Sequence, residues 1–282
     1  MKFVSELYNR YPGSDIYVVG TGASLRVFPL SFLEDKIVIG LNMAWKVVPV
    51  KYSVTIHPNL NIPAFIPGEE LHPEITWISG YFKTNTGGIV LKGVTSPELV
   101  KYAKKTFYFF EYHGQANTQP PNQPSASGRV LDWVRKPTEN YLYVWSSISQ
   151  TGVNLAANMG AKNIFLVGCD NCSLLKNHHA GQQHTRWKGV DPNLRYKQYY
   201  QGLAEVRTVL RERNINLLNI TPFLSLTHPE EDFERLCEEL DKPKLIENID
   251  VSPEIFSDSY ITRSGKAIRY GIKKLVEKIR IF

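Results

Sequence analysis

The stretch IYVVGTGASLRVFPL, from Ile16 to Leu30, decides how this sequence folds. Its first four residues are apolar without interruption, and small residues follow from Gly20 to Ser24. A continuous apolar run is typical of a parallel strand that is buried on both faces. Glycine allows a tight turn and the close approach of other atoms. The stretch therefore predicts a buried strand and a tight turn, which either holds a ligand or only connects the strand to the next element.

Similar apolar runs recur along the chain and predict the other strands of a parallel sheet. They are Lys36–Asn42, Tyr52–Pro58, Ile75–Gly80, Ile164–Asp170 and Ile215–Pro222.

Two segments between these runs have the character of helices. The stretch SQTGVNLAANMGAKN is rich in helix formers after a Thr-Gly turn and stops at Gly160. The segment Tyr196–Arg213 places Tyr199, Leu203 and Leu210 on one stripe. Strands that alternate with helices indicate an α/β fold with right-handed crossovers.

The chain has 282 residues. We expect a single α/β domain over residues 1–226 and a C-terminal helical extension, 227–282, packed on it. Residues 114–128 are rich in Pro, Asn, Gln and Ser, which predicts a mobile surface loop. A lid is expected at about residues 172–195. The extension is amphipathic and basic, which favours a docking helix over a helix on a membrane surface.

Composition narrows the class of protein. The formal net charge is +6, which is explained either by an anionic partner or by solubility alone. No apolar run approaches the ~20 residues that cross a bilayer, and the N-terminus does not resemble a signal peptide. We expect a cytoplasmic protein, with peripheral attachment at the inner membrane surface as an alternative. Of the three cysteines, Cys169 and Cys172 form a C-x-x-C, for which strand-end packing is favoured over redox chemistry or zinc.

Polar residues follow three of the predicted strands. Thr21 and Ser24 follow the first, Asn42 the second and His57 the third. The carboxyl ends of parallel strands lie side by side, and ligands bind there. A dinucleotide-dehydrogenase site is not favoured, because Leu25 stands at the third glycine of G-x-G-x-x-G and no acidic residue follows about twenty positions later.

The motifs VVGTGASLR and IGLNMAW resemble the G-x-G-P-S-L…N pattern of the bacterial lipooligosaccharide sialyltransferases. They also resemble a large related family, which includes motility-accessory proteins linked to flagellin glycosylation and archaeal 6-hydroxymethylpterin diphosphokinases. TGVNLAANMGAKNIFLVGCD is similar to a second motif of that family, S-G-V…A-x-x-L-G-x-K-x-I-x-L-x-G-x-D. The chain departs from the pattern where Ala23 replaces the proline and Thr21 the asparagine.

The resemblance implies a Rossmann-like, mostly parallel sheet flanked by helices, a variant of the GT-A type with a lid. It also implies a donor site for a nucleotide sugar. In that site the phosphate and sugar would contact Thr21, Gly22, Ser24 and Asn42, and the nucleoside would be cradled by Thr151 and Gly152. Position at strand ends adds three candidates, Gly20, His57 and Asp170.

The family's general base is a histidine after the G-x-D strand, beyond a lid. This sequence offers His178, His179 and His184, of which His184 lies nearest the family's position and His179 is the second candidate. A histidine titrates near working pH and can accept a proton from a hydroxyl. Zinc binding and a plain polar lid remain alternatives for this cluster. Arg186 is a candidate cation for the departing phosphate.

The favoured function is a metal-independent, inverting glycosyltransferase with a CMP- or UDP-linked donor and a hydroxyl acceptor on a glycan, a lipid-linked sugar or another macromolecule. The sequence has no D-x-D motif, so no metal and no cofactor beyond the donor are expected. The alternatives are a transferase acting on hydroxymethylated bases of phage DNA, a pterin-type diphosphokinase and a non-catalytic nucleotide-binding module. Assembly into a homo-oligomer stays open.

Overall fold

The structure is a computed structural model of the whole chain. It describes residues 1–22, 24–25, 28–59, 62, 68, 72–113, 139–144, 147–170, 177–179, 182–183 and 192–220. The predicted loop at 114–128 and the predicted extension at 227–282 lie outside these residues, as does most of the predicted lid.

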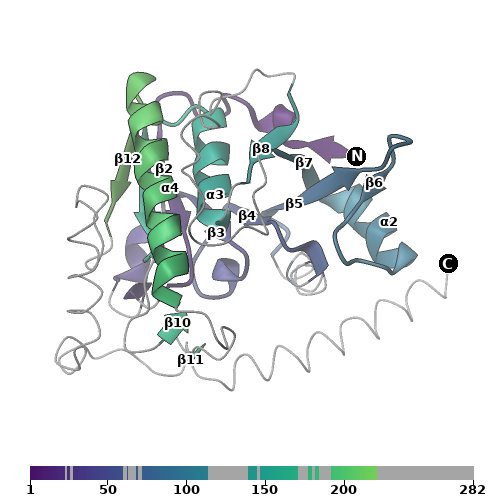
Figure 1. Ribbon diagram of the computed structural model, residues 1–282, viewed down its shortest axis with the longest axis horizontal. Helices are drawn as coiled ribbons and strands as arrows, with labels where there is room; N and C mark the ends of the chain where they lie inside the picture. The colour runs from purple at the N-terminus through teal and green to yellow at the C-terminus, as the bar shows by residue number, and fades with distance from the viewer. Residues whose placement is uncertain are drawn as a thin grey trace.

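A mostly parallel sheet forms the centre of the protein (Figure 1). Its order is β1-β7-β5-β4-β3-β2-β9-β12, and β8 also pairs with β7. The short strand β6 pairs with β5 and is antiparallel. The bounds are β1 Lys2–Phe3, β2 Asp15–Val19, β3 Ile37–Leu41, β4 Tyr52–Thr55, β5 Thr76–Lys83, β6 Ile89–Val90, β7 Tyr108–His113, β8 Tyr141–Tyr143, β9 Asn163–Val167 and β12 Asn216–Asn219.

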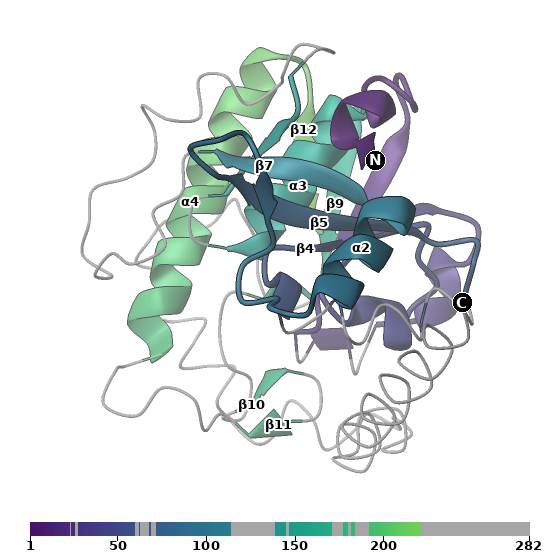
Figure 2. The same ribbon diagram turned by 90° about the vertical axis from the view of Figure 1, so that its right-hand side faces the viewer.

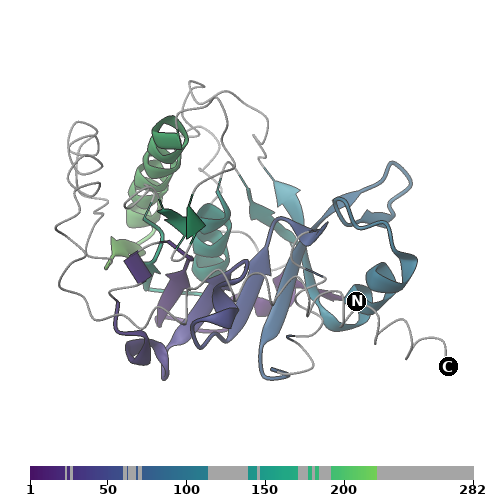
Figure 3. The ribbon, with the colours of Figure 1, turned by 90° about the horizontal axis from the view of Figure 1, so that it is seen from below.

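Helices cover both faces of this sheet. On one face lie α3 (Ile148–Asn158) and α4 (Pro192–Glu212), and on the other lies α2 (Pro97–Thr106) (Figures 1 and 3). The described residues also form the 3₁₀ helices η1 Val4–Leu7, η3 Leu30–Leu33 and η4 Ala44–Lys46. A separate pair, β10 (Asn177–His179) and β11 (Gln182–Gln183), is antiparallel.

Alternate residues of the strands feed the two cores. In β2, Ile16 and Val18 pack toward α3 and α4, whereas Tyr17 and Val19 pack with η3 and η4 on the opposite face. All four side chains are buried. This two-sided burial is the reason that the strand reads as an unbroken apolar run.

The α/β, Rossmann-like expectation is confirmed, with a mostly parallel sheet between helices. Each predicted strand is present within a few residues of its expected bounds, and β5 continues past Gly80 to Lys83. The sequence did not predict α2, β6 and β8 in the less readable middle, and it did not predict β1 at the start of the chain or the pair β10 and β11.

The prediction of a Thr-Gly turn before α3 is wrong. The helix begins earlier, because the Ser147 hydroxyl caps it by accepting a hydrogen bond from the amide of Ser149. Thr151 and Gly152 therefore lie inside the helix. The other end is as expected: Gly160 has φ +92° and stops the helix in the left-handed conformation that glycine favours.

Gly152 brings α3 close to the sheet. A Cβ on Gly152 would lie 2.7 Å from the Leu41 Cδ2 atom and 2.8 Å from the Val18 Cγ1 atom. Both neighbours are buried side chains of the central strands. Glycine at this position is thus explained by helix–sheet packing.

We expect Gly152→Ala to destabilise the protein. Overpacking a core costs about 1–3 kcal/mol, which outweighs the ~1 kcal/mol that alanine gains over glycine inside a helix. The free energy of unfolding, measured by urea denaturation, tests this. The control is Gly88→Ala, in an exposed turn where the nearest atom to the added Cβ is the Thr84 hydroxyl oxygen at 3.0 Å, and it should change the free energy of unfolding less. A Gly152→Ala variant as stable as the wild type would contradict the packing role.

Candidate functional site

The chain reverses its direction of travel across the sheet between β2 and β9. From β2 it adds β3, β4, β5 and β7 in turn on one side, and it then returns to place β9 on the other side of β2. In open α/β sheets, ligands bind outside the carboxyl ends of the strands at such a reversal. The carboxyl edge beside β2 and β9 is therefore the candidate site.

The turn after β2 and the turn after β9 are in direct contact at this edge. The Gly20 amide donates to the Val167 carbonyl and the Gly22 amide to the Gly168 carbonyl, both at 2.8 Å. A Cβ on Gly20 would lie 2.5 Å from the Gly168 carbonyl oxygen, and a Cβ on Gly22 2.6 Å from it. The two glycines of the G-x-G motif are thus required for the approach of another part of the chain.

A buried carboxylate completes this contact. Asp170, which is 4% exposed, accepts a hydrogen bond from the Ser24 amide at Oδ2, 2.8 Å away, and one from the Ser24 hydroxyl at Oδ1. Burial raises the pKa of the Asp170 carboxyl above its ordinary value, and the two hydrogen bonds from Ser24 lower it only in part. Within the described chain no cation contacts this carboxylate.

The amides of the turn are consequently used inside the protein. The amides of Gly20, Gly22 and Ser24 donate to Val167, Gly168 and Asp170, and the Leu25 amide donates to the Gly22 carbonyl at 3.1 Å. A strand-end turn with free amides is the usual cradle for a phosphate. Here the carboxyl group of Asp170 takes the place of that anion at the Ser24 amide.

Two more predicted residues lie at the same edge. Asn42 directly follows β3, which pairs with β2, and its side-chain Oδ1 accepts a hydrogen bond from the Thr55 hydroxyl, 3.0 Å away. His57 follows β4 and is exposed, and its amide donates to the Thr55 hydroxyl oxygen at 3.0 Å. The structure thus brings Thr21, Ser24, Asn42, His57 and Asp170 to the ends of four adjacent strands.

Thr151 and Gly152 are placed differently from this set. Thr151 is fully buried, and its hydroxyl donates to the Tyr143 carbonyl at 3.2 Å. Both residues lie in the second turn of α3, where backbone amides are bonded within the helix. Packing accounts for both, and no group of either is presented at the edge in this conformation.

The predicted catalytic residues lie largely beyond the described chain. His184 and Arg186 are outside it, and His179 is described only as the last residue of β10. Figures 1 and 2 both place β10 and β11 at the end of the molecule where α4 begins. Since α4 leads back to the amino end of β12, its start lies on the carboxyl side of the sheet. The backbone therefore places β10 on the carboxyl side of the sheet, where the candidate site also lies.

Cys169 is packed as expected. It is buried, and its thiol lies 3.8 Å from the Val18 carbonyl oxygen. Burial raises its pKa to about 12, and the neighbouring Asp170 carboxylate adds to this, so the thiol is protonated and unreactive at neutral pH. Within the described part of the chain no three His, Cys, Asp or Glu residues gather as metal ligands. Cys172 lies outside that part.

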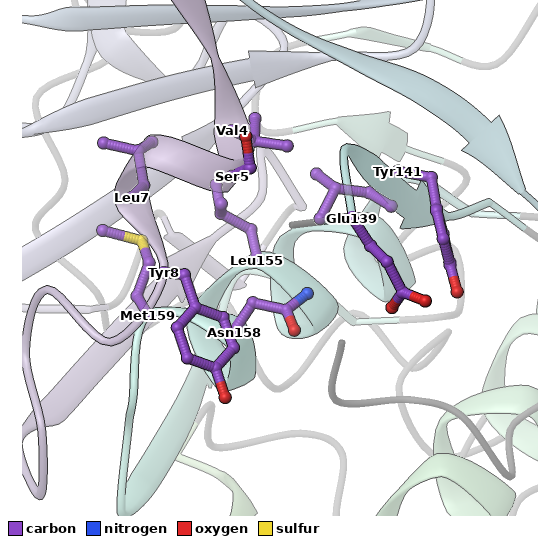
Figure 4. Close-up of a pocket in the computed structure, with 10 residues that line it drawn as sticks. Val4, Ser5, Leu7, Tyr8, Glu139, Tyr141, Leu155, Asn158 and Met159 are labelled. Carbon is purple, nitrogen blue, oxygen red and sulfur yellow. The ribbon is translucent and has the colours of Figure 1, made fainter. Parts of the chain in front are cut away.

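A pocket elsewhere in the fold is too small for a nucleotide (Figure 4). It lies between η1, β8 and the last turn of α3, and Tyr8, Glu139 and Asn158 are among its lining residues. The space that the centre of a water molecule can occupy is ≈ 10 Å³, which is room for about one water. This pocket also lies near the amino end of β2, since the Asn9 amide bonds the Asn158 carbonyl.

Sequence reasoning missed two residues that build the edge. Gly168 has φ +60°, and a Cβ there would lie 2.7 Å from the Leu25 Cγ atom. Its place between an apolar strand and the polar Asp170 was a usable signal for a turn. Thr55 ends a strand and organises Asn42 and His57, and nothing in its local sequence distinguishes it from other strand threonines.

No protein-family model matches this sequence, and no curated protein sequence matches it. Among solved structures, the chain is similar to the sialyltransferase CstII from Campylobacter jejuni, determined in complex with the substrate analogue CMP-3FNeuAc. The two are 13% identical, the match covers 74% of this chain and 82% of that chain, and the TM-score is 0.40. In the described residues, no helix is both long and apolar enough to cross a membrane.

The buried carboxyl of Asp170 gives a testable pH dependence. Its folded-state pKa is raised, so the folded protein holds a proton that the unfolded chain releases above about pH 4. Stability is therefore lost as pH rises from about 4 through the folded-state pKa. Asp170→Asn removes the titration and keeps both contacts, since Oδ1 accepts from the Ser24 amide and Nδ2 donates to the hydroxyl.

Urea denaturation between about pH 4 and pH 8 measures the effect. The wild type should lose free energy of unfolding relative to Asp170→Asn, by about 1.4 kcal/mol for each unit by which the pKa is raised. The control is Asp35→Asn. Asp35 is exposed beside Lys36, whose hydrogen bond lowers the pKa of Asp35, so this difference should stay flat above pH ~4. If the free energies of unfolding of wild type and Asp170→Asn changed in parallel with pH, the raised pKa of Asp170 would be contradicted.

Proposed function

We propose that this protein transfers a sugar from a nucleotide-sugar donor to a hydroxyl group on a glycan or another macromolecule, with the donor at the carboxyl edge beside β2. The donor is CMP- or UDP-linked, the reaction inverts the anomeric centre, and no metal takes part. The observation that carries the proposal is the convergence of Ser24, Asn42, His57 and Asp170 at the point where the strand order reverses. The resemblance of the two sequence motifs to sialyltransferases supplies the class of ligand.

The chemistry of the donor agrees with side-chain recognition. A nucleotide sugar presents hydroxyls and phosphate oxygens, and these require amide, hydroxyl and carboxylate partners. The edge holds one of each: the Asn42 amide, the Thr21 hydroxyl and the Asp170 carboxyl. Asp170 is engaged by Ser24 and buried. A ligand hydroxyl that bonds Asp170 therefore has to reach a buried carboxyl group that already accepts two hydrogen bonds.

The transfer step needs a base and a way to stabilise the leaving group. In the proposed step, His184 or His179 removes the proton of the acceptor hydroxyl while its oxygen bonds to the anomeric carbon. The bond from that carbon to the donor phosphate breaks, and the nucleotide leaves with the electron pair. Arg186 neutralises the charge on the phosphate. The position of β10, which ends at His179, at this side of the sheet supports the assignment.

A nucleotide screen tests the binding half of this proposal. We expect CMP or UDP at about 100 times its Kd to stabilise the protein by about 2.7 kcal/mol, which raises the Tm by about 5 °C or more. Asn42→Ala should reduce that shift. Its matched control is Asn214→Ala: both asparagines have positive φ, 53° and 58°, but Asn214 follows α4 and precedes the amino end of β12.

The second half of the proposal, the transfer of the sugar, depends on the general base. His184→Ala should keep the thermal shift with the nucleotide and lose sugar transfer, because the base acts on the acceptor and not on the donor. A shift with ATP and magnesium alone would overturn the proposal in favour of a diphosphokinase. Retention of full transfer by both His184→Ala and His179→Ala would remove the proposed base. No shift with any nucleotide would remove the donor site.

A further inference from the structure

Every hydrogen bond that the structure gives Asn42 is made with a residue of β4. Its backbone is in the left-handed region, with φ +53°, and its amide donates to the Val54 carbonyl at 2.8 Å. Its carbonyl accepts a long hydrogen bond, 3.4 Å, from the Ser53 hydroxyl. Asparagine tolerates this conformation better than most residues. The side chain therefore leaves the backbone from a fixed point at the end of β3.

The side-chain amide has two chemically different ends, and Thr55 engages only one of them. The Thr55 hydroxyl donates to Asn42 Oδ1, 3.0 Å away, and its oxygen accepts the His57 amide hydrogen, also 3.0 Å away. Thr55 is fully buried at the end of β4. The bonds run in one direction, from the His57 amide through the Thr55 hydroxyl to Oδ1. The oxygen of the Asn42 side chain is therefore bonded within the protein, and the nitrogen is the end left to face a ligand.

The other end, Nδ2, donates no hydrogen bond to any of the groups that the structure describes, and Asn42 is partly exposed. The Nδ2 end of the amide offers two N–H donors and cannot itself accept a hydrogen bond. It pairs with a group that accepts only, such as an oxygen of a phosphate or a carboxylate. It pairs poorly with a hydroxyl or amino group that must donate.

We propose that Thr55 is a positioning residue that fixes the polarity of Asn42, and that Asn42 thereby selects an anionic oxygen of the donor. The inference rests on the proposed function and deepens it. Neither the motifs nor strand position singled out Thr55. It acts through Asn42 and need not touch the ligand itself.

Three variants separate the steps of this proposal. Thr55→Val removes the hydroxyl at nearly constant volume, whereas Thr55→Ser keeps the hydroxyl and removes only the methyl group. Asn42→Asp keeps an acceptor for Thr55 and replaces the Nδ2 donor by a charged oxygen. Calorimetric titration with CMP and with UDP gives Kd, and urea denaturation of each variant reports any general loss of stability.

We expect Thr55→Val to weaken nucleotide binding by about fivefold, the effect of one net hydrogen bond, and Thr55→Ser to bind like the wild type. Asn42→Asp should weaken binding by about tenfold or more, since a charge-assisted hydrogen bond is replaced by repulsion. The expected order of affinity is therefore wild type and Thr55→Ser, then Thr55→Val, then Asn42→Asp.

The contrary outcomes are distinct. Equal affinity of Thr55→Val and wild type overturns the positioning role, even where Thr55→Val is less stable. Equal or tighter binding by Asn42→Asp shows that the ligand group donates, and it overturns the selection of an anionic oxygen. Both results leave the proposed function standing, because the nucleotide still binds. A wild type that binds neither CMP nor UDP overturns the proposed function and this inference together.

Discussion

The contact between the turn after β2 and the turn after β9 is the constraint on which the rest of the candidate site depends. Two backbone hydrogen bonds, from Gly20 and Gly22, join strands that lie far apart in the chain. No side chain larger than hydrogen fits at either position. The Ser24–Asp170 pair then closes the contact with a buried carboxylate. The ladder between β2 and β9 joins the two halves of the sheet, and this contact continues their pairing past the carboxyl ends of both strands.

Because of this contact, the glycine-rich turn has a different role from the turn of most nucleotide-binding folds. In many nucleotide-binding folds such a turn offers free amides to a phosphate, but here the amides bond the neighbouring turn and Asp170. Recognition at this edge is therefore proposed to depend on side chains such as Asn42, whose orientation is set by Thr55. Neutral donors on a rigid frame suit an anionic ligand, because they bind it without a counter-charge to desolvate.

The long buried strands of the sheet centre could be predicted from the sequence, and the contacts between their ends could not. Buried parallel strands produce continuous apolar runs, so β2 and β9 can each be predicted from their own residues. The pairing of Ser24 with Asp170 spans 146 positions and leaves no local pattern. Gly152 was misread as a turn residue, because a glycine that lets a helix approach a sheet looks the same in sequence as one that breaks a helix. Only the position of the helix against the sheet distinguishes the two roles of such a glycine.

The central claim, that a nucleotide donor occupies the carboxyl edge beside β2, is tested most directly by hydrogen–deuterium exchange with and without CMP or UDP. The account predicts slower exchange on ligand addition in peptides that cover Gly20–Leu25, Asn42 and His57, with little change in peptides of η1 and the end of α3. Protection confined to η1 and the end of α3, around Tyr8 and Asn158, would contradict it and place the ligand at the opposite edge of the sheet.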